Sequence, residues 1–381
     1  MEKRACLAHT AAVLLEKANL VKYDKRTGAL QSTLLGRIAA HFYVKHDSMQ
    51  IYNSTVKATV GVIELLRIFS LSKEFEHVPV REEEKPELQT LLEKVPIPVQ
   101  GGVEEPSTKI NLLLQAYISR LPLESFSLNS DLVYVTQSAG RIFRALFELA
   151  LQREYANVAE CVLQCCKMVE RRVWQSMTPL RQFRVGLRGE GNELLRNEDI
   201  LRRLENKEQF TWQHYRDMTA QQLGELVGSQ RNAAVLHKLI HQIPRLALTC
   251  FSQTLTRNTL LLQLELVADF HWDRARHGAA EAFWVFVENV DGEQLLHAEY
   301  FLLTERAALS KEKQLLSLVV PLFEPTPPSY FLKVISDRWL AAETTLPISF
   351  KHIYLPARFP PPSKLLDAPK LPISSLNWQP G

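Results

Sequence analysis

Two arginines and a serine at helical spacing are the residues of this chain best suited to contact a nucleic acid. Ser138, Arg141 and Arg144 follow one another at intervals of three, and Glu148 comes four residues later. On an α-helix such residues are neighbours, so the two guanidinium groups are expected to lie side by side. Arginine holds phosphate through charge-assisted hydrogen bonds, and a serine hydroxyl adds another contact. The set predicts a helix face that binds a nucleic-acid backbone, although a solvated charged face has the same pattern.

The helix that carries these residues is expected to be buried on its other side. Ile142, Leu146 and Leu149 recur at i, i+4 and i+7, which is the spacing of one apolar helix face. The residues from Thr136 to Ser138 favour the N-cap position, so the helix is predicted to begin there. A helix fixed by its apolar face can hold its arginines toward a bound strand.

A second candidate contact lies at a predicted helix-hairpin-helix. Two short helices are expected to meet at a tight turn near Gly228, with an apolar inner face that includes Leu236. Such a hairpin can present backbone N–H groups and the side chain of Arg231 to a phosphate. A packing module without a ligand is the alternative.

Other combinations of polar residues give weaker signals. His237 and His241 are spaced as a metal-binding pair on a helix, but no third ligand is evident. The five cysteines lack zinc spacing and are interpreted as buried or half-buried thiols. Arg181, with Arg184 and Arg188, is expected in an exposed segment. No GxxxxGK(S/T), GxGxxG, GxSxG or HExxH motif occurs, so the chain is predicted to have no catalytic residues and no cofactor of its own.

Composition is that of an ordinary globular protein. The 381 residues carry 45 Lys and Arg against 42 Asp and Glu, a net charge of +3, and 46% are hydrophobic. A chain so close to neutrality cannot coat nucleic acid through bulk charge, so any contact must come from a local patch. No run of about 18 apolar residues is present, which argues against a membrane span.

The periodicity of apolar residues changes along the chain and predicts an α+β, multidomain fold. Helical spacing dominates the first two thirds, and strand-like alternation follows, as in Leu260, Leu262, Leu264 and Leu266. The opening residues read as a helix, a short hairpin and a second helix capped by Thr33. This order is the closing half of a winged-helix domain, which suggests that the chain begins within a longer polypeptide. The predicted units are a winged-helix remnant (1–45), a helical bundle (46–175), a helix-hairpin-helix domain (176–248), an immunoglobulin- or fibronectin-like β-sandwich (249–365) and a Pro-rich linker (366–381).

The order of these units resembles the Sec63-like units of large superfamily 2 RNA helicases. The similarity is greatest to the N-terminal cassette of the spliceosomal members of that family. One departure is the segment 184–209, which is longer than the usual connection between bundle and hairpin. The runs that carry the resemblance include NLVKYDKRTG, LGRIAAHFY, VREEEKPELQTLLEKVPIPV, VYVTQSAGRIFRALFE, WQSMTPLRQF, YFLKVISDRWLA and FPPPSKLLD.

The resemblance implies a role for the candidate residues. Ser138 and Arg141 correspond to contacts that a ratchet helix makes with a threaded RNA strand, and Arg144 and Glu148 follow on the same helix. The hairpin with Arg231 would lie beside the RNA exit. ATP and Mg²⁺ would be bound by RecA-like domains that are absent from this chain. The implied partners are those RecA domains, the second cassette of the same helicase, U4/U6 RNA and scaffold proteins of the U5 small nuclear ribonucleoprotein, in the nucleus.

Three other interpretations stay open at this point. The near-neutral charge and the predicted sandwich also fit a pure protein-interaction scaffold. The related helicase of the activating signal cointegrator complex shares these motifs in kind, although the run from residue 80 to 99 favours the spliceosomal family. The translocation protein of the endoplasmic reticulum has the same unit, but the lack of a membrane span counts against it.

Overall fold

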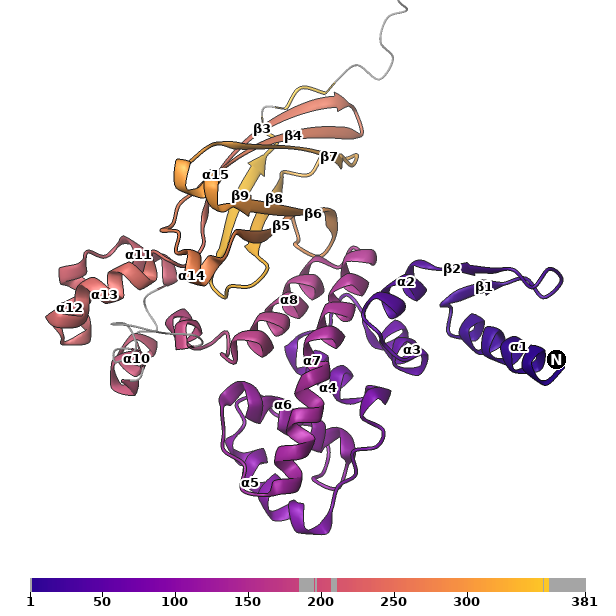
Figure 1. Ribbon diagram of the computed structural model, residues 1–381. Helices are drawn as coiled ribbons and strands as arrows, with labels where there is room; N and C mark the ends of the chain where they lie inside the picture. Colours follow the sequence, from indigo (N-terminus) through magenta and orange to yellow (C-terminus); the bar gives the residue numbers. More distant parts are fainter. Residues whose placement is uncertain (1, 185–194, 196, 207–210, 352, 356–381) are drawn as a thin grey trace, which may run out of the picture.

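The computed structural model describes residues 2–184, 195, 197–206, 211–351 and 353–355. Helices make up most of the first two thirds of the chain and strands most of the last third (Figure 1). The expected α+β class is therefore confirmed. The α-helices are α1 (Glu2–Lys17), α2 (Leu34–His41), α3 (His46–Thr55), α4 (Val62–Ser70), α5 (Lys85–Lys94), α6 (Pro106–Ser119), α7 (Phe126–Gln152), α8 (Ala156–Arg171), α10 (Glu198–Glu205), α11 (Trp212–Asp217), α12 (Ala220–Val227), α13 (Gln230–Ile240), α14 (Arg274–His277) and α15 (Glu305–Ser310), with 3₁₀ turns η1 (Lys73–Phe75), η2 (Glu82–Glu84) and η3 (Pro179–Arg184).

The first helix, a short hairpin and the second helix follow the order predicted for the N-terminal residues. The hairpin turns through Gly28, whose φ of +74° is easily reached only by glycine. Thr33 caps α2 by accepting a hydrogen bond from the backbone N–H of Gly36 at 3.0 Å. The two hairpin strands are β1 (Val21–Tyr23) and β2 (Leu30–Ser32).

Strands β3 to β9 form two antiparallel sheets that share one apolar core. The leucines of β4 from Leu260 to Leu266 alternate inward as predicted, and the turn at Gly292 joins β5 to β6. The strand orders are β3-β4-β7 and β6-β5-β8-β9. The strands are β3 (Leu246–Thr256), β4 (Thr259–Ala268), β5 (Ala280–Glu288), β6 (Leu295–Thr304), β7 (Gln314–Pro321), β8 (Ser329–Ser336) and β9 (Glu343–Ser349).

The four-stranded sheet is covered on both faces. On one face Phe283 and Val285 lie in the core between the two sheets. On the other face Phe286 and Ile335 belong to the core of the helical bundle. The ring of Phe147 from α7 lies 5.0 Å from that of Trp284 on β5, measured between centroids. Bundle and sheet are therefore continuous in packing, as their neighbouring places in Figure 1 show.

Helix α7 begins at Phe126, so the predicted start at Thr136 is wrong. The hydroxyl of Thr136 donates to the carbonyl oxygen of Leu132 at 2.8 Å, within the helix, and caps nothing. The apolar face continues toward the N-terminus through the buried Leu128 and Val135. This extra length lets one rigid element span the whole bundle.

The segment 184–209, predicted to be a surface loop or a short exposed helix, contains a helix that is partly buried. Ile200 and Leu204 of α10 lie in an apolar core with the hairpin helices. Arg181 is 8% exposed and forms ion pairs with Glu205 at 2.6 Å and Glu198 at 3.0 Å, so its expected exposure is also wrong. Acidic partners more than 15 residues away cannot be read from local pattern. Most of the rest of that segment, and the linker at 366–381, lie outside the described residues.

A carboxyl group is buried under the sandwich without full hydrogen bonding. Glu281 on β5 is 0% exposed. Its Oε1 accepts a hydrogen bond from Trp339 Nε1 at 3.0 Å, while its Oε2 has no partner within the described chain. Burial raises the pKa of Glu281 from 4.5 to about 7.

Glu281→Gln is expected to stabilise the protein at neutral pH but not in acid. Because the folded pKa lies above the unfolded one, ionisation of the unfolded chain removes stability as pH rises from 4.5 to about 7. The substitution should raise the free energy of unfolding on the order of 2 kcal/mol at pH 7.5. Urea denaturation at pH 4 and pH 7.5 measures this, and an equal effect at both pH values contradicts it.

Candidate nucleic-acid interface

Helix α7 is buried around most of its circumference and open along one stripe. Its buried residues include Ala139, Ile142 and Leu146, which confirms the predicted apolar face. The stripe includes the exposed Gln137 and Gly140. A Cβ placed on Gly140 would meet no atom within 4 Å, so the helix surface at this residue lies open. The half-buried Ser138, Arg141, Arg144 and Glu148 border the stripe.

Ser138 and Arg141 are in direct contact. The Nη2 of Arg141 donates to the Ser138 Oγ at 3.1 Å. The Nη1 of Arg141 donates to the backbone carbonyl oxygens of Tyr43 and, at 3.4 Å, Phe42, just after α2. Since the Ser138 oxygen accepts from Arg141, its own proton stays available to donate. The pair presents donors beside the open surface at Gly140.

Arg144 is engaged by a carboxylate from the β-sandwich. Its guanidinium forms a bidentate ion pair with Asp337, in which Nη1 lies 2.5 Å from Oδ1 and Nη2 lies 3.0 Å from Oδ2. Trp284 Nε1 donates to the same Oδ1 at 2.9 Å. Arg141 and Arg144 bond different partners, since Arg141 reaches the residues that follow α2 and Arg144 reaches the segment that follows β8. Arg144 joins α7 to the β-sandwich.

The other two predicted residues take separate positions. Glu148 is half-buried one turn after Arg144, and burial raises its pKa against the opposing effects of His41 and Arg144. Arg231 is exposed at the start of α13, after a turn in which Gly228 has a φ of +73°. Figure 1 places α12 and α13 well away from α7. The structure therefore brings Ser138 and Arg141 together and leaves Arg231 elsewhere.

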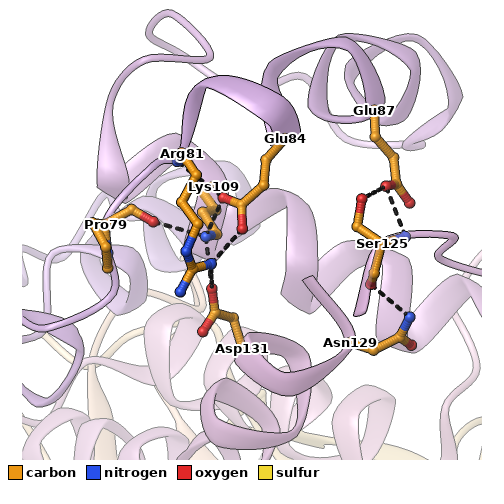
Figure 2. A network of polar contacts seen from close by, with 8 residues as sticks. All are labelled: Pro79, Arg81, Glu84, Glu87, Lys109, Ser125, Asn129 and Asp131. Carbon is orange, nitrogen blue, oxygen red and sulfur yellow. Dashed lines mark hydrogen bonds and ion pairs between the residues drawn. The ribbon is translucent and has the colours of Figure 1, made fainter. Parts of the chain in front are cut away.

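Buried charges fix the N-terminal half of α7 (Figure 2). The Lys109 Nζ, from α6, is 0% exposed and lies 2.6 Å from Glu84 and 2.7 Å from Asp131 of α7. It also donates to the carbonyl oxygen of Pro79 at 2.8 Å. Arg81 reaches both carboxylates from the other side. Burial alone would raise the pKa of Glu84, but hydrogen bonds led by that from Lys109 lower it to about 2.

The first turn of α7 is held by a carboxylate from another helix. Glu87 of α5 accepts hydrogen bonds from the backbone N–H of Glu124 at 2.7 Å, and from the N–H and hydroxyl of Ser125. Ser125 itself is the N-cap of α7 and makes no side-chain cap bond. A negative charge at this end also complements the helix dipole. Three hydrogen bonds to one carboxylate thus hold the residues from which α7 starts.

Lys109→Met is expected to lower the free energy of unfolding by about 3–5 kcal/mol, because it leaves two carboxylates without their buried cation. Lys85→Met is the matched control, since the Lys85–Glu82 pair at 2.8 Å is in solvent with Glu82 88% exposed. The control should cost less than about 1 kcal/mol. Chemical denaturation measures the free energy of unfolding of both variants. Equal decreases would show that the buried network stabilises the fold no more than a surface ion pair does.

Arg144→Ala is expected to lower the free energy of unfolding by about 2 kcal/mol through loss of its charged hydrogen bonds. Arg67→Ala is a suitable control, because Arg67 is 52% exposed and pairs only along α4 with Glu64. Thermal melting at matched salt measures both. A purely solvated Arg144 would melt like the control.

The remaining sequence candidates show no metal chemistry. Within the described ranges no group of three or more His, Cys, Asp or Glu could hold a metal ion. The rings of His237 and His241 lie 4.2 Å apart, centroid to centroid, against each other. Cys6 is exposed, so the prediction of buried or half-buried thiols is wrong for that residue, while the other four cysteines follow it. No helix in the described part of the chain has the length and apolar content for crossing a bilayer.

Several residues that shape this surface gave no signal in the sequence. Asp337 meets Arg144 across 193 positions, and Lys109 meets Asp131 across 22. Local spacing cannot predict either pair. Gly140 did carry a signal, because glycine in the middle of a strongly helical run needs a reason.

A comparison with protein families identifies the class to which the chain belongs. Residues 32–349 match the family model described as the Sec63 Brl domain. The match covers most of the chain, which therefore belongs to the Sec63 Brl domain family. The resemblance noted in the sequence is confirmed.

Particular relatives are named as RNA helicases or as a splicing factor. The human protein named U5 small nuclear ribonucleoprotein 200 kDa helicase is 50% identical over 375 residues, which are 98% of this chain and 17% of that protein. The Arabidopsis thaliana DExH-box ATP-dependent RNA helicase DExH12 gives the same identity and coverage. The pre-mRNA-splicing factor brr2 of Schizosaccharomyces pombe is 46% identical over 99% of this chain and 17% of its own length. The chain thus spans about a sixth of these relatives.

Proposed function

We propose that this chain is the non-catalytic accessory region of a spliceosomal RNA helicase and guides a single strand of RNA along α7. The observation that supports this most is the open stripe at Gly140, with the Ser138–Arg141 pair beside it. Little base readout is needed, because a single-stranded backbone is held by positive charge in a groove. The near-neutral net charge of +3 requires such a local site.

The units of the fold support the same assignment. We interpret α1, the β1–β2 hairpin and α2 as part of a winged-helix domain, and α12 with α13 as the helix-hairpin-helix. The two sheets, of three and four strands, fit a sandwich of the immunoglobulin or fibronectin type. Domain boundaries near residues 45, 175, 248 and 365, and the place of the chain in the N-terminal cassette, are part of this proposal.

The mechanism assigns a distinct task to each residue. Arg141 exchanges its contacts with the carbonyl oxygens of Phe42 and Tyr43 for a phosphate oxygen of the RNA. Ser138 keeps the guanidinium oriented and donates its hydroxyl proton to the same phosphate. Arg144 acts as a positioning residue through Asp337. Each phosphate contact is worth roughly 1.5–3 kcal/mol, which permits release in every cycle.

The proposed partners follow from the relatives. RecA-like domains of the same polypeptide bind ATP and Mg²⁺ and perform the hydrolysis, and this chain supplies no catalytic group. The RNA is the U4/U6 pair, the protein partners are the second cassette and U5 scaffold proteins, and the location is the nucleus. Identities of 46–50% to helicases named for U5 and splicing favour this over the helicase of the activating signal cointegrator complex.

Arg141→Ala in the complete helicase should slow ATP-dependent unwinding of a U4/U6 duplex by roughly tenfold or more, the effect of losing one charged contact. Basal ATPase activity should stay unchanged, and the melting temperature should fall less than in Arg144→Ala, because Arg141 bonds neutral carbonyl oxygens whereas Arg144 pairs with a carboxylate. Arg67→Ala, an arginine on α4, is the control with parental unwinding. Parental unwinding by Arg141→Ala would disprove the role of α7.

A protein-interaction scaffold is the second candidate. The outer face of the three-stranded sheet exposes Phe251 (59%), Leu315 (77%) and Val319 (53%), an apolar surface typical of contact sites. Under this function, Arg141→Ala would unwind normally, and substitutions such as Val319→Glu would weaken assembly with U5 proteins instead.

A further inference from the structure

The β-sandwich exposes an aromatic ring with an apolar neighbour, here called the patch, on the face that meets the helical bundle. Tyr300 on β6 is 52% exposed and Leu302, two residues on, is 53% exposed. Both lie on the face of the four-stranded sheet that packs against the bundle, since Tyr300 pairs in register with Trp284 and Leu302 with Ala282. Bundle helices cover Phe286 on this face but leave Tyr300 open.

A short chain of contacts connects this patch with α7. The rings of Tyr300 and Trp284 meet edge to face, with centroids 5.1 Å apart. Trp284 Nε1 donates to Asp337 Oδ1 at 2.9 Å, and Asp337 holds Arg144 of α7. Because Trp284 meets Tyr300 edge to face, the open part of the tyrosine ring is free to stack with a planar group.

Charges of both signs surround the patch. Burial raises the pKa of the Tyr300 hydroxyl, as does the charge of Asp337, while Arg144 and Arg338 act in the opposite direction. The side chain of Arg338 is 41% exposed and lies 3.7 Å from Glu170. The carboxylate of Asp337 is paired with Arg144. Burial raises the pKa of Glu281 to about 7, so this carboxyl is partly neutral at physiological pH. The patch therefore combines an open aromatic ring with arginine.

We propose that Tyr300 is a stacking site for one nucleobase of the single-stranded RNA that passes along α7. The phosphate would be held by the Ser138–Arg141 pair and a neighbouring base by the tyrosine ring, with Leu302 covering the base edge. An aromatic ring beside basic residues is the combination with which proteins bind single strands regardless of sequence. This inference rests on the proposed function, because it needs the strand to follow α7.

The test uses the complete helicase and a single-stranded oligoribonucleotide that carries 5-iodouridine. Four variants are compared by fluorescence anisotropy and by photo-crosslinking: Tyr300→Ala, Tyr300→Phe, Phe251→Ala and Arg141→Ala. Phe251→Ala is the matched control, because Phe251 is a similarly exposed ring on the far sheet. Tyr300→Ala should raise the Kd by about fivefold or more and abolish a crosslink to residues 295–304. Tyr300→Phe and Phe251→Ala should bind within about twofold of the parent, since each leaves a ring at position 300.

The outcomes separate the two proposals. If Arg141→Ala weakens binding and Tyr300→Ala binds like Phe251→Ala, the stacking site is wrong while the function of α7 stands, and the patch is then a candidate protein contact. If neither variant weakens binding, both proposals fail. Should Tyr300→Ala melt early, Tyr300→Leu restores apolar area without a ring. Recovery of RNA affinity in Tyr300→Leu would overturn stacking, and continued loss would support it.

Discussion

Burial of the four-stranded sheet on both faces is the constraint on which the rest of the structure depends. Phe283 faces the sandwich core and Phe286, three positions later on β5, faces the bundle. A strand with both sides in apolar cores cannot shift its register without exposing large side chains to water. Helix α7 packs against this sheet through Phe147, so the sheet also fixes the position of the C-terminal half of the helix.

The N-terminal half of α7 is held by a different kind of force. Its ties are the buried ion network around Lys109 and the cap from Glu87, which depend on charge, whereas the C-terminal half depends mainly on apolar contact. A buried network needs all its members, because one missing partner leaves an unpaired charge. The helix is therefore fixed at one end by geometry and at the other by electrostatics. The Ser138–Arg141 pair lies between them, where the helix is supported from both sides.

Much of this architecture could be predicted from local pattern, and the gaps have physical causes. Alternating leucines from Leu260 to Leu266 predicted β4, and Thr33 predicted the start of α2, because period and capping are local properties. Thr136 led to a wrong prediction of the start of α7. A threonine inside a helix can hydrogen-bond to the preceding turn, and such a residue has the same local pattern as an N-cap. The ion pair of Arg144 could not be predicted either, because sequence spacing describes the surface of a helix and not the elements that pack against it. Ion pairs formed across long stretches of chain, such as that with Asp337, leave no trace in spacing.

The two carbonyl oxygens that hold Arg141 have a consequence for how fast a ligand can leave. A guanidinium that faces water loses its hydration when it binds a phosphate, which costs free energy, and it must be rehydrated when the phosphate leaves. Arg141 instead donates its hydrogen bonds to carbonyl oxygens of the residues that follow α2. In the proposed function, a phosphate would compete with these acceptors, which would lower its affinity, and they would take its place when it leaves. Such an exchange of acceptors would suit a strand that moves in steps.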